Sequence, residues 1–296
     1  MHPALSIILF TTLSGLGFGM FCWLGMGAVP EAARQAAAIV AFGLCSAGLS
    51  ASTFHLGHPE RSWRAFSQWR SSWLSREGVM AVVTLGLSVP WWFLAYPAWL
   101  GALLAVFALV TVYTTAMIYA QMKSVQQWNT PWTPVVFVFM SLAGGGLMSA
   151  LATALVDSVS KGYAIAIALL LIVAWAAKAN WWRRADSDIE ISDTASATGL
   201  ADGGQVRMLE SPHSGTNYLL SEMGFRVGRK HSRTLRRIAL LAGGALPLLV
   251  LALSLQFAGG ATVLLSLAIL LHLIGVLSER WLFFAEARHA VVSFYE

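Results

Sequence analysis

The chain has 296 residues, of which 57% are hydrophobic and only 11% are charged, and its formal net charge is +5. A soluble domain carries about 25% charged residues, so this composition excludes a water-soluble globular protein and predicts a polytopic α-helical membrane protein. The basic residues gather at the ends of apolar runs, where membrane topology accounts for them, so the positive charge does not indicate nucleic-acid binding.

Eight apolar segments are long enough to cross a bilayer, because a transmembrane helix needs about 20 mainly apolar residues. The first segment lacks the basic region of a secretory signal, so we interpret it as a retained helix. The third and fourth segments, and likewise the seventh and eighth, are joined by very short connections that imply antiparallel hairpins. The expected helices of this single membrane domain are Ala4–Ala28, Gln35–His55, Gly78–Tyr96, Ala98–Ala120, Pro134–Val156, Gly162–Trp181, Ile238–Phe257 and Ala261–Phe283.

An even number of spans places both termini on one side, together with the loops that follow the second, fourth and sixth helices. That side receives all but two of the 19 basic residues, since only Arg34 and Lys161 fall on the other side. By the positive-inside rule the crowded side is cytoplasmic. It also carries the one long loop, residues 182–237, whose last part, Arg226–Arg237, is basic and holds no acidic residue. That basic segment is either a topology anchor on anionic lipid or a docking surface for a soluble partner.

Two further residue types inside the spans are interpreted as packing residues. The only cysteines, Cys22 and Cys45, lie in apolar runs without a CxxC motif, and they cannot supply the four thiolates that an iron–sulfur cluster usually takes. No strand precedes the intramembrane glycines, so close helix packing explains them better than a phosphate-binding loop does. These glycines are Gly15, Gly17, Gly19 and Gly144–Gly146.

Ionisable residues inside a membrane span are costly and often functional, and few occur here. His55 ends the second expected helix, and Glu77 opens the third. His272 and Glu279 lie nearly two turns apart on one face of the eighth helix. All of these residues but His272 belong to the crowded side of the membrane, and His272 lies nearer the middle of the membrane.

The loop between His55 and Glu77 is rich in aromatic residues. Trp63, Phe66 and Trp73 can share one face of a short helix that lies in the membrane interface, with the arginines on another face. Such a helix would roof a pocket whose walls are the ends of the second and third helices.

These parts suit a quinone site. The flat quinone ring needs apolar and aromatic walls, its oxygens need hydrogen-bond donors, and its redox change needs a titratable group nearby. His55 can donate to one oxygen and Glu77 can exchange the proton. The alternative for the same residues is that His55 caps its helix and that Glu77 pairs with a nearby arginine. The full candidate set is His55, Glu77, Arg76, Trp63, Trp73 and His58.

Two other classes of function compete with this hypothesis. A haem b cytochrome needs paired histidines on facing helices, and only His55 and His272 lie in or at the end of a span, which allows one haem at most. A transporter favours broken helices and charges near the midplane, which here holds little beyond His272.

At the candidate site the chain resembles a known family. The segment Ser52–Phe66, which reads STFHLGHPERSWRAF, resembles the loop after the second helix in the DmsC family, the anchor subunits of dimethyl sulfoxide reductase. Leu74–Gly78 resembles that family's start of helix three. Val112–Tyr119 and Trp128–Pro134 resemble its exit from helix four and its Trp-Thr-Pro entry into helix five. The eight expected spans also match the family.

The resemblance implies a three-subunit complex. A molybdopterin catalytic subunit and an iron–sulfur subunit would dock on this anchor, which would bind a quinone (ubiquinone or menaquinone) and hold no haem and no metal. The family's quinol-site histidine and glutamate fall on His55 and Glu77 by matching motif positions. The partner is expected to dock on Met208–Phe225, the C-terminal segment and a set of basic residues. That basic set comprises Arg61, Arg64, Arg70, Arg226, Arg229 and Lys230.

One departure from the family pattern concerns orientation. Dimethyl sulfoxide reductase anchors carry their termini and quinol site on the outer side, whereas the charge distribution here puts them inside. The long loop and the segment Glu279–His289 are more similar to the SoeC-type anchors of cytoplasmic sulfite-oxidising complexes. This similarity implies electron flow from sulfite to quinone in a bacterial inner membrane. The alternative is a quinol-oxidising anchor of the dimethyl sulfoxide reductase type.

Overall fold

The structure is a computed structural model that describes residues 4–54, 58–187 and 226–290, together with residues 195, 198–200, 206, 209 and 210 of the long loop. Every regular element in these ranges is a helix, and they contain no strand. The expected all-α class is therefore confirmed.

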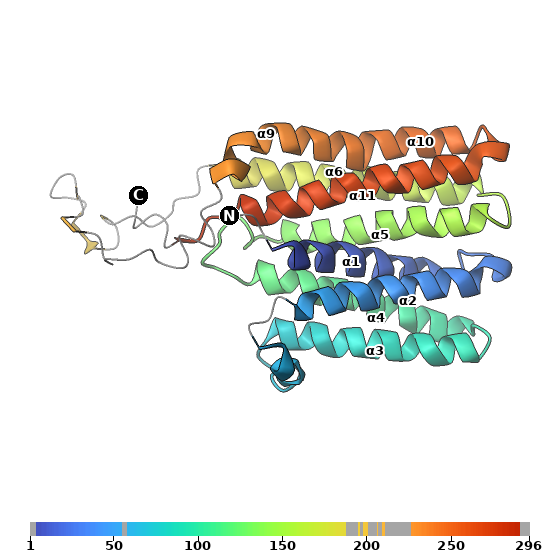
Figure 1. Cartoon of the computed structure of the whole chain (residues 1–296), viewed down its shortest axis with the longest axis horizontal. Helices are drawn as coiled ribbons and strands as arrows, with labels where there is room; N and C mark the ends of the chain where they lie inside the picture. Colours follow the sequence, from blue (N-terminus) through green and yellow to red (C-terminus); the bar gives the residue numbers. More distant parts are fainter. Residues whose placement is uncertain are drawn as a thin grey trace.

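The long helices lie side by side with their ends roughly aligned (Figure 1). The helix α9 continues through the π-helical segment η3 into α10, so these three elements form one rod. The short 3-10 helices are η1 (Pro59–Phe66) and η4 (Ala258–Gly260). The long elements are α1 (Leu5–Gly25), α2 (Glu31–Thr53), α3 (Trp73–Phe93), α4 (Ala98–Ala120), α5 (Trp132–Ala154), α6 (Lys161–Asp186), α9 (Arg226–Leu240), η3 (Leu241–Ala245), α10 (Leu246–Ser254) and α11 (Ala261–Ala285).

Seven of the described helices are long and apolar enough to cross a membrane, and the rod formed by α9, η3 and α10 contributes one of them, His231–Ser254. This establishes a multi-pass membrane protein. The helix α3 does not meet the same hydropathy criterion. Its second turn holds the charged pair Arg76 and Glu77, and its last turns hold Pro90 and two tryptophans, which lower its mean hydropathy. The count of eight spans stays a prediction.

The two ends of the bundle differ in what they carry. The start of α1, the helix η1 and the end of α11 lie at one end, which we call the loop end (Figure 1). There Trp128 Nε1 donates to the Phe283 carbonyl at 2.9 Å, and the Ala290 amide donates to the Ser124 carbonyl at 2.8 Å. The other end carries the α1–α2, α3–α4, α5–α6 and α10–α11 connections, and we call it the hairpin end. The loops after the second, fourth and sixth helices thus share one end, as expected.

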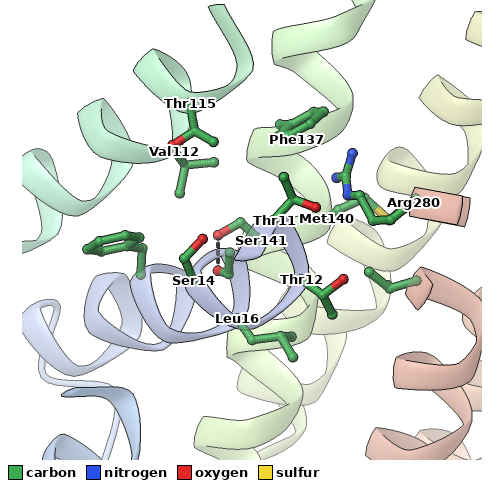
Figure 2. A pocket seen from close by; sticks show the side chains of 13 residues that line it. Thr11, Thr12, Ser14, Leu16, Val112, Thr115, Phe137, Met140, Ser141 and Arg280 are labelled. Carbon is green, nitrogen blue, oxygen red and sulfur yellow. Dashed lines mark hydrogen bonds between the residues drawn. The ribbon is translucent and has the colours of Figure 1, made fainter. Parts of the chain in front are cut away.

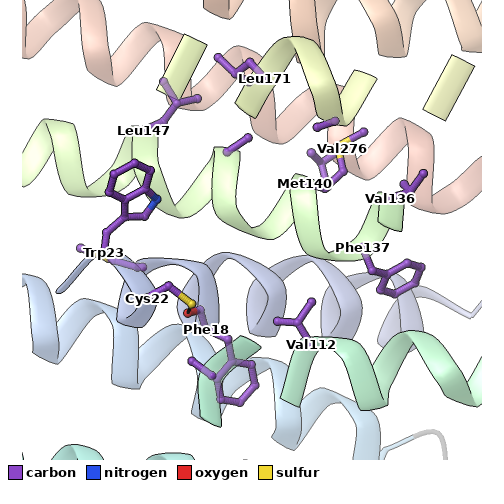
Figure 3. Close-up of a cluster of buried hydrophobic side chains, with 14 of the residues drawn as sticks. Phe18, Cys22, Trp23, Val112, Val136, Phe137, Met140, Leu147, Leu171 and Val276 are labelled. Atoms are coloured by element: carbon purple, nitrogen blue, oxygen red, sulfur yellow. Dashed lines mark hydrogen bonds between the residues drawn. The ribbon is translucent and has the colours of Figure 1, made fainter. Parts of the chain in front are cut away.

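The core is built around α1, whose apolar side chains meet those of α4, α5, α6 and α11 (Figure 3). A Cβ on Gly19 or Gly145 would collide with the backbone of the facing helix, and a Cβ on Gly17 would lie 2.6 Å from Cys45 Sγ. These contacts confirm the packing interpretation of these glycines. Gly15 differs, because its Cβ position has nothing within 4 Å. Cys22 and Cys45 are buried free thiols, as expected of packing residues.

The basic segment Arg226–Arg237 is helical, because α9 begins at Arg226 rather than at the expected Ile238. Its Arg236 ties two other helix ends together: Nη2 donates to Asp186 Oδ1 at 2.9 Å, and Nε donates to Glu286 Oε1 at 2.9 Å. Burial raises the pKa of the Glu286 carboxyl above its ordinary value, and the neighbouring Arg236 opposes that shift. These ion pairs at the loop end fix α9 to the ends of α6 and α11.

Candidate functional site

A short aromatic roof covers the start of α3. The helix η1 ends at Phe66, whose ring packs on Gly78 so closely that a Cβ there would lie 3.3 Å from Phe66 Cε1. Trp63 is 64% exposed on the outer face of η1. Trp73 does not belong to η1, because it is the first residue of α3, and its ring meets Tyr113 edge-on at 6.0 Å. The three aromatic residues expected on one helix are thus divided between η1 and α3, and the pocket expected beneath them stays a prediction.

Glu77 lies in the second turn of α3, because that helix begins at Trp73 and not at the expected Gly78. Its side chain is buried, and Oε1 has no hydrogen-bond partner. No cation within the described ranges lies within 4 Å of this carboxyl. A buried carboxyl without a partner is costly, so it needs a proton, a water molecule or a ligand. The alternative in which Glu77 pairs with an arginine finds no partner among these residues.

Arg76 turns away to hold the roof. Its Nε donates to the Trp69 carbonyl at 3.0 Å, its Nη2 donates to the Arg70 carbonyl at 2.7 Å, and its guanidinium lies 4.3 Å from the centre of the Trp73 ring. These contacts fix the turn between η1 and α3. Arg76 therefore acts on the geometry of the roof through backbone carbonyls.

Of the two histidines in the candidate set, the structure describes only His58. His55 lies in residues 55–57, outside the described ranges. His58 is exposed, and its Nδ1 lies 3.0 Å from Oε1 of Glu60, which is also exposed. The structure thus places His58 on the surface, while Glu77 is buried.

The structure describes the side chains of only half of the six basic residues expected to dock the partner. Arg61, Arg64 and Arg70 are exposed at the loop end, where the last two stack on the neighbouring Trp63 and Trp69 at 5.6 Å. The basic residues Arg226, Arg229 and Lys230 lie in the first turns of α9, whose side chains fall outside the description. Apart from residues 209 and 210, Met208–Phe225 is also outside the described ranges.

A buried ion triad joins α6 to α11. Lys178 Nζ lies 2.6 Å from Glu279 Oε1, and Arg280 Nε lies 3.3 Å from Glu279 Oε2, with side chains 0–2% exposed. Both cations also rest on aromatic rings: Lys178 Nζ lies 3.8 Å from the Trp181 ring, and Arg280 Cζ lies 3.7 Å from the Phe137 ring. Two cations share one carboxylate, so the triad carries a formal charge of about +1 that the ring faces partly offset.

Sequence reasoning singled out Glu279 but counted Lys178 and Arg280 among the basic residues of the crowded side. The structure buries both. The sequence contains an indication of this burial, because Lys178 falls inside the expected span 162–181 and Arg280 inside the expected span 261–283. A charge within an apolar span is itself an indication of an internal partner.

A polar cavity lies beside Arg280, between α1, α4, α5 and α11 (Figure 2). It leaves about 20 Å³ for the centre of a water molecule, which is room for about one water. Two of its lining groups, Thr12 Oγ1 and Arg280 Nη1, are buried without a hydrogen-bond partner, so a bound water would satisfy them. The polar lining residues are Thr11, Thr12, Ser14, Thr115, Ser141 and Arg280.

Tyr119 of α4 lies in an aromatic cluster near the end of α11. It is 5% exposed, and its ring meets Trp128 edge-on with centroids 5.4 Å apart. Its ring packs edge-on against Phe283, with centroids 5.5 Å apart. Tyr119 therefore packs α4 against the end of α11 through aromatic contacts.

His272 lies deeper in the bundle and is held by a π-helical turn. Its Nδ1 lies 2.7 Å from the Gly243 carbonyl within η3, so Nδ1 carries the proton, and Nε2 has no partner. Gly144 of α5 packs against the ring, where a Cβ would lie 3.1 Å from Nε2. Within the described ranges, no group of three or more His, Cys, Asp or Glu side chains could hold a metal ion.

Comparisons with known proteins show the family of the chain. The family model described as DMSO reductase anchor subunit (DmsC) matches residues 1–285. A sulfite dehydrogenase subunit of Allochromatium vinosum is 32% identical over an alignment that covers 100% of this chain and 99% of that protein. The resemblance to DmsC and to the sulfite-oxidising anchors that the sequence indicated is confirmed.

Proposed function

Because the chain belongs to the DmsC family of DMSO reductase anchor subunits, we propose that it is the quinone-reactive subunit of its complex and passes electrons between a docked iron–sulfur subunit and the quinone pool. Its role as the membrane anchor of an oxidoreductase follows from family membership and from its apolar helices. The quinone role is supported by one observation above all, the buried and unpartnered Glu77 carboxyl beneath an aromatic roof.

The proposed partners are an iron–sulfur subunit, and behind it a molybdopterin catalytic subunit, both at the loop end. Exposed Arg61, Arg64 and Arg70 support this placement, because such a surface suits an acidic partner. The loop end also carries the long connection between α6 and α9. We propose that the loop end faces the cytoplasm and that the membrane is a bacterial inner membrane, because the basic residues gather at this end.

The residues near Glu77 are proposed to hold a quinone headgroup. Phe66, which packs on Gly78, and Trp73, which meets Tyr113, would supply flat apolar walls. The buried Glu77 would supply a carboxyl that can give or take a proton at the ring oxygen. His55 is proposed as the donor to the second oxygen. A bound quinone would supply two-electron chemistry coupled to two protons, and the roof would keep bulk water from the carboxyl.

The buried triad and the cavity beside Arg280 are proposed to lie on the path of the proton that the quinone gives up or takes up. The cavity beside Arg280 has room for about one water. Such a water can pass a proton between hydroxyls and the loop end.

The direction of electron flow is proposed as sulfite oxidation feeding quinone. Support comes from the full-length relative, whose name is that of a sulfite dehydrogenase subunit. Membranes that contain the complete complex should reduce added quinone when sulfite is supplied. Quinol oxidation that depends on dimethyl sulfoxide, without sulfite-dependent quinone reduction, would instead establish the reductase alternative.

The Glu77→Gln variant tests the quinone site. It keeps the side-chain shape and removes the titrating proton, so quinone turnover should fall at least tenfold while the complex still assembles. Glu60→Gln is the matched control, because Glu60 is an exposed carboxyl at the same end, and it should keep the parent rate. Both variants should retain activity with a soluble artificial electron carrier, because that route bypasses the membrane.

His55→Ala removes the proposed donor to a quinone oxygen. A net hydrogen bond of about 0.5–1.5 kcal/mol corresponds to a roughly two- to tenfold weaker quinone affinity. Measured KM for quinone should rise by that factor. If Glu77→Gln and His55→Ala both turn over quinone at the parent rate, the pocket is wrong, and His272 and Glu279 become the next candidates.

A further inference from the structure

A larger pocket lies at the hairpin end, far from the candidate quinone site. The ends of α1 and α3 and the starts of α2 and α4 enclose about 330 Å³ in which the centre of a water molecule fits. That space is large enough for a small ligand group. Its walls are formed by the α1–α2 turn Leu24–Gly27, by Trp91 and Tyr96, and by Ala98 and Ala102 of α4.

Arg34 is the one charged side chain in the lining of this pocket. Its Nη2 donates weakly to the Val29 carbonyl at 3.4 Å, and its Nε is buried without a hydrogen-bond partner. No carboxylate in the described part of the chain lies within 4 Å of it. The acidic residue nearest in the chain is Glu31, one turn earlier on α2, and it is exposed and forms no ion pair with Arg34 within 4 Å. A partly buried guanidinium with an unpartnered Nε is suited to an anionic ligand.

The turn between α3 and α4 shapes the pocket with a strained backbone. Ala95 and Tyr96 have φ values of 57° and 62°, in the left-handed region that residues with a Cβ rarely adopt. The Tyr96 amide donates to the Trp91 carbonyl at 2.9 Å, and the two rings meet edge-on at 4.8 Å. This strain holds the Tyr96 ring 5.3 Å from the Arg34 guanidinium. Strained turns persist where the surrounding structure over-determines them, often at ligand sites.

The surroundings of the pocket are apolar and exposed. Met26 and Leu94 are each 60% exposed, and Trp99 is 64% exposed. Trp99 opens α4 beside the lining residue Ala98, where an interfacial tryptophan is expected to contact lipid headgroups. A ligand here would therefore meet a cation inside the pocket and acyl chains outside it.

We propose that this pocket binds the phosphate of an anionic phospholipid, with the guanidinium of Arg34 as its counter-ion and the acyl chains lying against Met26 and Leu94. The phosphate chemistry is common to a lipid headgroup and to free inorganic phosphate. The exposed apolar rim favours the lipid, because free phosphate gains nothing from it. The site does not depend on the proposed quinone role.

The test uses the purified full-length protein in detergent, stripped of lipid, with phosphatidylglycerol added back and bound lipid counted by native mass spectrometry. The parent protein should retain one phosphatidylglycerol more tightly than the rest. Arg34→Gln should weaken that binding about ten- to hundredfold, since it removes a charge-assisted contact. Lys161→Gln is the matched control, because Lys161 is the other basic residue of this end and does not line the pocket.

Each other outcome overturns the proposal. Equal retention by the parent and Arg34→Gln removes Arg34 from the site, and equal loss in Lys161→Gln shows a general effect of surface charge. Displacement of the lipid by millimolar inorganic phosphate identifies a free anion as the ligand. Retention of a quinone in place of phospholipid identifies a second quinone site. If Arg34→Gln fails to fold, Arg34→Lys replaces it. Phosphatidylglycerol should then bind about two- to tenfold more weakly than to the parent, because lysine keeps the charge but cannot bind the phosphate with two parallel hydrogen bonds. Equal affinity of Arg34→Lys and the parent would overturn the proposal.

Discussion

Removing the single carboxylate of the buried triad should destabilise the bundle far more than removing one of its cations. Glu279→Gln leaves Lys178 and Arg280 facing each other, buried to 0% and 2% exposure, without a counter-ion. Breaking a buried ion pair by removing one partner costs about 3–5 kcal/mol. For a chain of this size each kcal/mol lowers the melting temperature by roughly 2–4 °C, so a fall of about 6–20 °C is expected.

Lys178→Met is the informative comparison. It leaves Glu279 paired with Arg280 at 3.3 Å and places an apolar side chain of similar length against Trp181. Exchanging a buried ion for a well-packed apolar group is often neutral, so a change of about 1 kcal/mol or less is expected. The assay is thermal unfolding of the purified protein in detergent, followed by the fluorescence of its 13 tryptophans. Equal losses in the two variants, or a larger loss in Lys178→Met, would refute the reasoning.

Three further predictions concern packing, orientation and cofactor content. Gly145→Val should abolish accumulation of the protein in membranes, because a side chain there collides with the backbone of α1. Gly43→Ala should accumulate normally, because its Cβ position has nothing within 4 Å, and comparable membrane levels of the two variants would contradict the close packing of α1 on α5. In sealed cells Ser187→Cys should stay unreactive to a membrane-impermeant thiol reagent, and Ser158→Cys should react with it. These two exposed residues lie at opposite ends of the bundle, and the natural cysteines are buried. The reverse labelling pattern would show that the loop end faces outward. The purified anchor, freed of partners, should show no Soret band, and a band lost in His272→Ala would establish the cytochrome alternative.

Deletion of Met208–Phe225 tests the docking surface. The soluble subunits should be released from the membrane fraction, while the anchor itself stays in it, because the deleted segment lies outside the spans expected from the sequence. Partners that remain bound at normal strength would show that this segment is only a linker. In that case the exposed Arg61, Arg64 and Arg70 would carry the contact.

The sequence by itself determined the class of protein and most of its helices. Hydropathy is a local property of the chain, because a bilayer forces each span to satisfy its own backbone hydrogen bonds and to present apolar side chains. The order of the spans likewise predicted which loops share an end, and the motif around Glu77 indicated the family. These conclusions need no knowledge of which helix touches which.

Tertiary structure decided where the charges go. The chain pattern alone could not show that Glu77 lacks a partner, that Lys178 and Glu279 meet across two helices at 2.6 Å, or that Arg34 faces a pocket. Each of these depends on the rotation of one helix against another, which is set by the close crossing of small residues such as Gly19 and Gly145. Burial of a charge is a property of the packed bundle, because the same lysine at the end of an apolar run can reach the interface or a carboxylate on its neighbour.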